Sequence, residues 1–253
     1  MAVKAARAAG LHEGIRQVRA AVPPLERDLR RRRMAFYTSW ISPGDLCFDV
    51  GANVGNRVDI FVRLGARVVA VEPQPECLAE LRRRFGQSGQ VTILPFGLAA
   101  SKGSMLLHVS STYHPVSTMS ERFMDETKAS GRFGDTTWTT TQEVEVATLD
   151  SVIREYGMPR FCKIDVEGFE YEVLRGLSQP LPALSFEFTP EVLEQTSRCL
   201  ERLAALGEYE YNFSLGESMR WESEWSGGPA LLAALSRFAP GSDWGDVYAR
   251  LVS

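Results

Sequence analysis

Two glycines and two acidic residues are spaced in this chain as they are in sites that bind a nucleoside. The stretch LCFDVGANVG (residues 46–55) leads from a short apolar segment through Asp49 to Gly51 and Gly55. Glu72 ends the next apolar segment, RVVAVEP, 21 residues after Gly51. An acidic residue about 20 positions beyond a glycine turn, at the tip of the second strand of an α/β unit, can accept hydrogen bonds from ribose hydroxyls. The spacing therefore predicts a nucleoside-binding turn.

The turn departs from the dinucleotide pattern G-x-G-x-x-G, because Asn53 stands where the middle glycine would be. Asparagine tolerates left-handed backbone geometry, so the turn can still form. Gly51 lets the chain leave the strand sharply, and Gly55 lets a ligand and the next helix approach closely. No pattern marks a bound pyrophosphate, and Asp49 would lie better beside an ammonium group than beside a diphosphate. The sequence favours S-adenosylmethionine over NAD, with a bend that only packs helix on strand as the structural alternative.

A second set of acidic residues follows two apolar segments later in the chain. In FCKIDVEG (residues 161–168), Lys163 and Asp165 alternate with apolar side chains, and Glu187 does so in ALSFEFTP. If these segments are adjacent parallel strands, Asp165, Glu167 and Glu187 meet at the carboxyl edge of the sheet. Carboxylates held close together raise the pKa of one of them, which makes a usable general base. They could instead hold a divalent ion through their oxygens.

Asp165 is the first candidate for the general base, with Glu187 beside it. The structural alternative is a Lys163–Asp165 ion pair that fixes the strand ends, because unpaired buried charges are costly. The alternative for Glu167 is a structural role, in which its side chain fixes the position of the helix that follows FCKIDVEG. We expect no bound metal, because the sequence offers carboxylates here but no clear third ligand.

His108 and His114 flank the stretch VSSTY. A histidine suits removal of a hydroxyl proton, because its pKa is near neutral. His114, in a polar loop and followed by Pro115, is the better candidate for a catalytic residue. A surface histidine is the alternative for each.

The elements that must position these residues alternate between predicted strands and predicted helices, as in an α/β fold. Apolar segments alternate with amphipathic helical stretches over residues 46–98 and again over 149–207, which predicts a parallel sheet covered on both faces. The last two candidate strands, YEYNFSLG and DVYARLV, have no full crossover helix pattern between them. That ending predicts an antiparallel strand at the sheet edge.

An insertion at residues 103–147 interrupts this alternation of strands and helices. GSMLLHVS and QEVEVATL predict two further strands that form a β-hairpin, and the connection from Ser111 to Thr141 is rich in Ser, Thr and Gly. A long polar connection in a compact domain is usually a functional lid or is disordered. We expect this insertion to form a lid over the acceptor, and to be mobile until the acceptor binds.

Composition places the chain among globular proteins. Its 253 residues can bury a full core in a single domain, and a net charge of −4 with interspersed charges argues against a general nucleic-acid binder. No apolar run approaches a membrane span, and the first residues lack the apolar region of a secretory signal. Four scattered cysteines without a C-x-x-C pair suit a reduced cytosol, so we expect a cytoplasmic protein.

The N-terminal segment (residues 1–40) holds the one local extreme of charge. Residues 3–38 read as helical with a break near Pro23 and Pro24, and Arg27 is followed by the run Arg30–Arg33. We interpret this basic cluster as a solvated helix end. Contact with an anionic membrane surface or an acidic polysaccharide is the alternative.

Four stretches, FDVGANVG, VEP, KIDVEGFEYEVLRGL and SFEFTPE, resemble the FkbM-type S-adenosylmethionine-dependent methyltransferases. The resemblance runs from about residue 36 to the end, and WGDVYARL is similar to one subgroup. Its most specific feature is DVGANVG followed about 110 residues later by KIDVEG. It implies the Rossmann-like class I methyltransferase fold, a mostly parallel seven-stranded sheet whose last strand is antiparallel. It also implies methyl transfer to a hydroxyl, often on a sugar or polyketide.

The resemblance implies a set of cofactor contacts as well. Residues that match the family's pattern and would contact S-adenosylmethionine are Asp49, Gly51, Asn53, Gly55 and Glu72. Phe96, just after the third strand, would flank the adenine.

The leading hypothesis is an O-methyltransferase whose acceptor is a small molecule or a glycan, with no nucleic-acid partner and no integral membrane segment. One alternative is methylation of an amine or a protein side chain, which would require a more acidic or more open acceptor pocket. Another is a binding protein that kept the cofactor site and lost the transfer reaction. No pattern in the chain indicates an oligomeric state.

Overall fold

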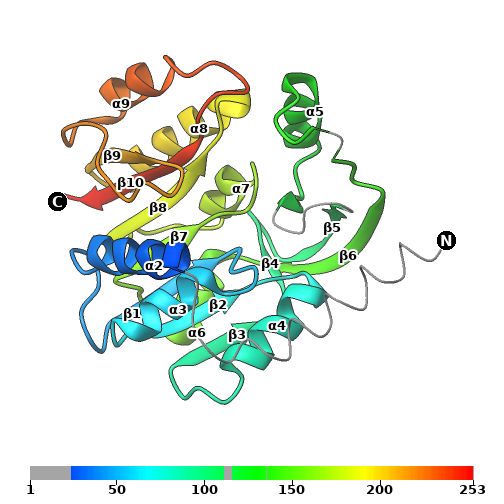
Figure 1. Ribbon diagram of the computed structural model, residues 1–253, viewed down its shortest axis with the longest axis vertical. Helices are drawn as coiled ribbons and strands as arrows, with labels where there is room; N and C mark the ends of the chain where they lie inside the picture. The colour runs from blue at the N-terminus through cyan, green and yellow to red at the C-terminus, as the bar shows by residue number, and fades with distance from the viewer. Residues whose placement is uncertain (1–23, 111–115, 135, 253) are drawn as a thin grey trace.

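A twisted sheet of seven strands runs through the centre of the computed structural model (Figure 1). The structure describes residues 24–110, 116–134 and 136–252. The strand order is β3-β2-β1-β7-β8-β10-β9. Its strands are β1 (Leu46–Val50), β2 (Arg67–Val71), β3 (Val91–Leu94), β7 (Phe161–Ile164), β8 (Ala183–Phe188), β9 (Tyr209–Leu215) and β10 (Gly245–Leu251). All five residues of β1 and all four of β7 are buried, as expected for central strands covered on both faces.

The direction of the strands agrees with the sequence pattern. The pairs from β3 to β8 are parallel, and β10 runs antiparallel to both β8 and β9. The predicted class I arrangement, a mostly parallel sheet of seven strands with an antiparallel last strand, is confirmed. β10 lies one position inside the sheet, and β9 is the outermost strand on that side.

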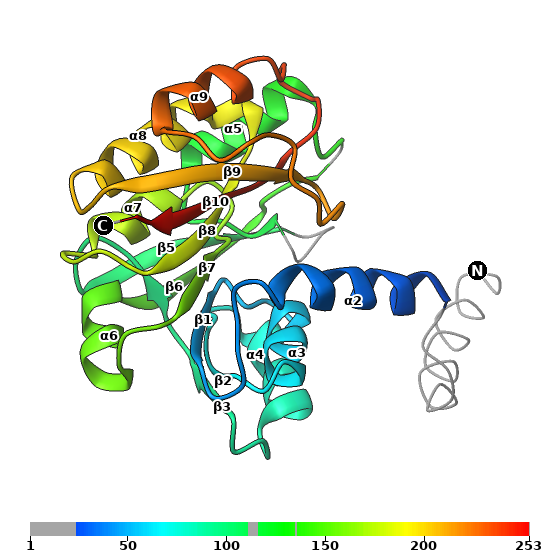
Figure 2. The same ribbon diagram turned by 90° about the vertical axis from the view of Figure 1, so that its left-hand side faces the viewer.

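Helices cover both faces of the sheet, and their buried side chains form two separate hydrophobic cores (Figure 2). One face carries α2 (Pro24–Tyr37), α3 (Asn56–Arg63) and α4 (Pro75–Phe85). The other carries α6 (Leu149–Tyr156), α7 (Glu170–Arg175), α8 (Leu193–Ala204) and α9 (Gly228–Leu235), with the short 3-10 helix η2 (Pro190–Val192) before α8. The predicted helix over residues 3–38 is present from Pro24 onward, and its earlier part lies outside the described residues.

The insertion forms a second, smaller sheet. Its strands are β4 (Gly97–Leu98), β5 (Gly103–Val109) and β6 (Thr140–Ala147), in the order β4-β6-β5, and β5 pairs with β6 antiparallel as predicted. This sheet stands beside the carboxyl ends of the central parallel strands (Figure 1). It forms a wall of the candidate site described below.

Helix α5 (Glu121–Ser130) lies between β5 and β6 and was not predicted from the sequence. The Ser120 side chain accepts a hydrogen bond from the Phe123 backbone N–H, and Gly131 ends the helix in a left-handed conformation. Phe123 is fully buried and packs against Gly168, where an added Cβ would lie 2.6 Å from the Phe123 ring. The described part of this connection therefore has a buried apolar anchor, although Ser, Thr and Gly dominate its sequence.

Candidate cofactor and acceptor site

The glycine turn leaves β1 with three residues in the left-handed region. Gly51, Asn53 and Gly55 have φ angles of 79°, 49° and 83°. The expectation that Asn53 adopts left-handed geometry is confirmed. Gly51 is also required by a close approach, because a Cβ added there would lie 1.8 Å from the backbone oxygen of Asp165. The turn after β1 thus lies directly against the end of β7.

Replacing Gly51 with alanine should displace the turn from β7. Strain at a positive φ alone costs about 1–3 kcal/mol, and the clash with Asp165 adds to it. We expect Gly51→Ala to lower the free energy of unfolding by more than the control Gly44→Ala, and to weaken cofactor binding. Gly44 has a φ of 90° but no atom within 4 Å of an added Cβ, so it isolates the backbone strain. Urea denaturation measures the free energy of unfolding of the two variants, and calorimetry measures their cofactor affinity. If both variants lose the same stability and affinity, the contact of Gly51 with β7 is unimportant.

Glu72 fixes the turn from the tip of β2. Its Oε2 accepts a hydrogen bond from the Asn53 backbone N–H, and its Oε1 accepts one from the Gln74 backbone N–H, both at 2.8 Å. Burial raises the pKa of Glu72 to about 7, although these two hydrogen bonds act in the opposite direction. A carboxylate offers about four acceptor positions, so two donors leave room for ribose hydroxyls.

Asp49 lies under the turn, one residue before the end of β1. It is 2% exposed, and its Oδ2 has no hydrogen-bond partner among the described residues. Burial raises the pKa of Asp49 to about 6, with the positive charges of Lys163 and Arg57 opposing the shift. A buried carboxylate oxygen without a donor is costly unless a ligand supplies one.

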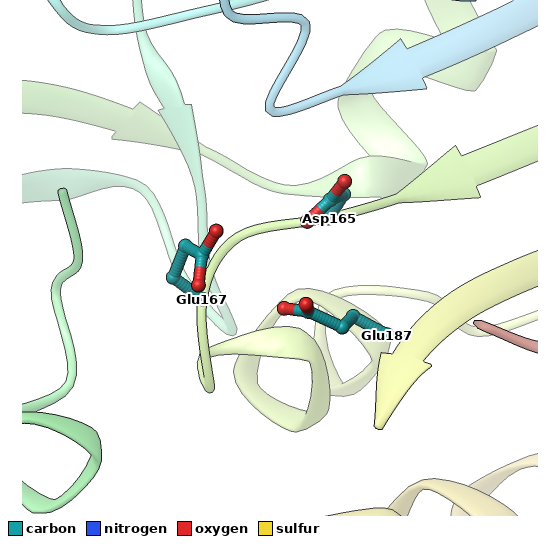
Figure 3. A group of neighbouring side chains, drawn as sticks. All are labelled: Asp165, Glu167 and Glu187. Atoms are coloured by element: carbon teal, nitrogen blue, oxygen red, sulfur yellow. The ribbon is translucent and has the colours of Figure 1, made fainter. Parts of the chain in front are cut away.

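The acidic cluster predicted from the two strand ends is present (Figure 3). Asp165, Glu167 and Glu187 each offer a carboxylate oxygen, and these oxygens lie within 4.8 Å of one another. Burial and the mutual repulsion of the carboxylates raise the pKa values of Glu167 and Glu187 well above their ordinary range. Oε2 of Glu187 is buried without a hydrogen-bond partner among the described residues.

Lys163 links this cluster to the last strand. Its Nζ lies 2.5 Å from Asp165 Oδ2 and 3.9 Å from Asp246 Oδ1, and Lys163 and Asp246 are 2% and 3% exposed. Burial disfavours the charge of Lys163, but the two carboxylates outweigh that effect and raise its pKa. The ion pair considered from the sequence therefore exists, yet Asp165 is not its only carboxylate. Asp246 was not identified from the sequence, although an aspartate in the apolar strand β10 needs a partner as Lys163 does.

Both groups of residues open into one cavity of about 680 Å³. The turn and β2 contribute Asp49, Gly51, Asn53 and Glu72, and the ends of β7 and β8 contribute Lys163, Asp165, Glu167 and Glu187. The insertion and the segment before β10 complete the wall with Leu107, Val116, Thr118, Met119, Arg132, Phe133 and Trp244. A cavity of this size falls in the range that takes a cofactor or a drug-sized ligand.

Two predicted cofactor residues do not line this cavity. A Cβ at Gly55 would point at α4, 2.5 Å from Phe85 and 2.8 Å from Leu81, so Gly55 permits helix packing and not ligand approach. Phe96 is half-buried and packs against the hydrophobic core. The neighbouring Gly97 lines the cavity in its place.

Of the two candidate histidines, only His108 is among the described residues. His108 lies on β5 and pairs through its backbone with Thr118, and it does not line the cavity. His114 lies outside the described residues. Its catalytic role stays a prediction.

A buried ion pair not foreseen from the sequence joins the insertion to η2, the short helix that follows β8. Arg132 donates from Nε and Nη2 to the two carboxylate oxygens of Glu191, each at 2.8 Å. Ser130 Oγ and the Gly241 backbone N–H also donate to Glu191 Oε1. Thr118 Oγ1 donates to the Glu167 backbone oxygen, so a second contact holds the insertion over the acidic cluster. The side chains of Arg132 and Glu191 are 9% and 1% exposed.

The comparison with known families decides the identity of this site. The model of the methyltransferase FkbM domain matches residues 49–213, which contain both the glycine turn and the acidic cluster. The chain belongs to the FkbM methyltransferase family. S-adenosylmethionine is the cofactor of that family, and the site fits it, because the Asp49 oxygen without a donor could take its ammonium group.

Two curated proteins are similar to this FkbM domain. The hexuronic acid methyltransferase AglP of Haloferax volcanii is 30% identical over 147 residues, which cover 56% of this chain and 54% of that protein. The methyltransferase sdnD of Sordaria araneosa is 30% identical over 162 residues, which cover 52% of this chain and 60% of that protein. The matches thus span little more than half the length of these relatives.

Among solved structures, the precorrin-6y C5,15-methyltransferase of Geobacter metallireducens has a TM-score of 0.46 and 12% identity. The alignment covers 91% of this chain and 92% of that one.

Proposed function

We propose that this protein is an S-adenosylmethionine-dependent O-methyltransferase that acts on a hydroxyl group of a sugar, a glycan or a natural product. One observation carries the proposal. A single cavity in an FkbM-family chain holds both the glycine turn with its acidic partner and the cluster of Asp165, Glu167 and Glu187.

In this proposal the β1–β2 side of the cavity binds the cofactor. Asp49 accepts hydrogen bonds from the ammonium group, and Glu72 accepts them from the ribose hydroxyls through its remaining lone pairs. Gly51 and Asn53 let the backbone pass close to the ligand. Bound S-adenosylmethionine supplies a methyl group that its sulfonium makes electrophilic.

The β7–β8 side holds the acceptor. Asp165 takes the proton of the attacking hydroxyl, and Glu187 lies close enough to share it. Alignment of the hydroxyl with the methyl group contributes up to about 7–11 kcal/mol in favourable intramolecular cases. The insertion, held by Glu191, covers this side and excludes water.

Two observations support a sugar hydroxyl as the acceptor: the similarity to a sugar methyltransferase, and an aromatic side chain in the cavity that holds the acidic cluster. AglP is a hexuronic acid methyltransferase, which supports a sugar as acceptor. Trp244 lines the cavity and is 39% exposed, so its ring offers an apolar surface of the kind on which sugar rings stack.

The acidic cluster also favours a second candidate, methylation of an amine. Three carboxylates within 4.8 Å of one another would attract a cationic acceptor, and this more acidic pocket is what N-methylation was expected to require. The two candidates share the cofactor site and differ in the product.

Two measurements test the proposal. Calorimetry should show binding of S-adenosylmethionine and its demethylated product, and none of NAD. Transfer from labelled cofactor to a panel of glycans, hydroxylated metabolites and amines should then yield methyl ethers. Methylated amines as the sole products would establish the second candidate, and tight NAD binding without cofactor binding would reject both.

Cofactor affinity should fall in acid. Because burial raises the pKa of Asp49 to about 6, this carboxylate gains a proton as the pH drops through that value and then no longer attracts an ammonium group. Glu72, with a pKa raised to about 7, adds a second dependence at higher pH. Calorimetry should show binding that weakens by up to about tenfold per pH unit between pH 7 and 6, where one carboxylate titrates, and more steeply below pH 6, where both do. The Asp49→Asn variant should bind the cofactor weakly, and its affinity should lack the steeper dependence on pH below 6. A wild-type affinity that rises in acid would contradict the role of Asp49 in binding the ammonium group.

A further inference from the structure

Positive charge is concentrated at the N-terminal end of this chain. The first 37 residues contain nine arginines and lysines against three acidic residues, a net charge of +6. The other 216 residues contain 19 basic and 29 acidic residues, a net charge of −10. Among the described residues of this segment, the exposed arginines do not line the cavity; they are Arg27, Arg31 and Arg32.

Helix α2 presents part of this charge to solvent. Arg27, Arg31 and Arg32 are exposed, whereas Tyr37, on the opposite side of the helix, is fully buried against the sheet. Asp28 forms an ion pair with Arg32 at 3.1 Å, which leaves a net positive charge on the outward face. No helix among the described residues is long and apolar enough to cross a membrane.

An aromatic side chain flanks this basic face. Trp221, in the loop after β9, is 37% exposed and lies with its ring 4.5 Å from that of Phe36 on α2. Phe36 is one helical turn from Arg32, so the indole lies at the Arg32 end of this basic face. Arginine beside a partly exposed tryptophan is typical of segments that lie at a membrane–water interface.

We propose that the outward face of α2, formed by Arg27, Arg31 and Arg32 with Trp221 at its border, binds an anionic membrane surface. The acidic remainder of the chain is repelled by such a surface, so the protein would approach it with this face. Figure 2 shows α2 extending from the side of the molecule, with its outer end away from the other labelled helices. Arg33, on the same helix, lines the cavity and donates to Glu217, so the membrane would adjoin the opening of the site.

Vesicle sedimentation tests this proposal without an acceptor. The protein should bind vesicles of phosphatidylcholine with added phosphatidylglycerol, bind phosphatidylcholine alone weakly, and dissociate at high salt. The variant with Arg27, Arg31 and Arg32 all changed to glutamine should bind roughly a hundredfold more weakly. The same three residues changed to lysine should retain binding, because the charge is kept.

A second triple variant serves as the matched control. Arg154, Arg160 and Arg175 are exposed and come from the region of α6, β7 and α7, outside the α2 face, so changing them to glutamine alters the net charge equally. This control should bind as the wild type does. Failure of the wild type to bind the anionic vesicles, or equal loss in both triple variants, would overturn the proposal. Retention on heparin without vesicle binding would assign the face to a soluble polyanion instead.

Discussion

Asp165→Asn should cut methyl transfer at least ~100-fold, the lower end of what general base catalysis supplies. The change preserves shape, so cofactor affinity should stay nearly constant. Stability should fall by less than the 3–5 kcal/mol expected when a buried charge loses its only partner, because Lys163 still has Asp246 at 3.9 Å. Single-turnover rates with labelled cofactor and urea denaturation measure the two effects on one variant.

Glu172→Gln is the matched control for Asp165→Asn. Glu172 lies on α7, pairs with Arg175 at the surface and does not line the cavity, so its loss should leave turnover unchanged. If Asp165→Asn turns over normally but unfolds easily, Asp165 serves only to neutralise Lys163. Adding a chelator to the wild type should leave the rate unchanged, and activity lost with chelator and restored by magnesium would make the cluster a metal site.

Several parts of the site could be predicted because they follow from local patterns. The left-handed turn at Asn53 and the position of Glu72 depend on a strand, a turn and a helix that are adjacent in sequence. The meeting of Asp165 and Glu187 required one further assumption, that β7 and β8 are parallel neighbours, and their register confirms it. Both residues stand at the ends of these strands, which places their carboxylates at the carboxyl edge of the sheet.

Other parts depend on contacts between distant segments, which no local pattern encodes. Asp246 lies 83 residues after Lys163 in the sequence. It comes close to Lys163 only because β10 pairs with β8. Gly55 has a typical ligand-turn spacing, yet the position of α4 decides that it packs against Phe85. Helix α5 was missed because its polar composition resembles a loop, and Phe123 becomes an anchor only through its contact with Gly168.

Glu191→Ala should detach the insertion from η2. Burial alone would raise the pKa of Glu191, but hydrogen bonds from Arg132, Ser130 and the Gly241 backbone outweigh it and lower that pKa. Glu191 is therefore ionised in neutral solution, and its removal leaves the buried Arg132 guanidinium without a carboxylate. Removing one partner of a buried ion pair costs about 3–5 kcal/mol of stability. We expect this loss to appear as local unfolding of α5.

Hydrogen exchange separates local opening from general unfolding. In Glu191→Ala, amides of α5 should exchange faster while those of β1 stay protected, since the central sheet does not depend on this ion pair. Glu194→Ala is the control, because Glu194 pairs with Arg122 at the surface, where both side chains are largely exposed, and it should leave exchange unchanged. Arg132 and Phe133 line the acceptor side of the cavity, so methyl transfer should fall while S-adenosylmethionine still binds. Full protection of α5 in Glu191→Ala would show that the contacts of Phe123 and Thr118 hold the insertion without the ion pair, and that the ion pair has no part in closing the site.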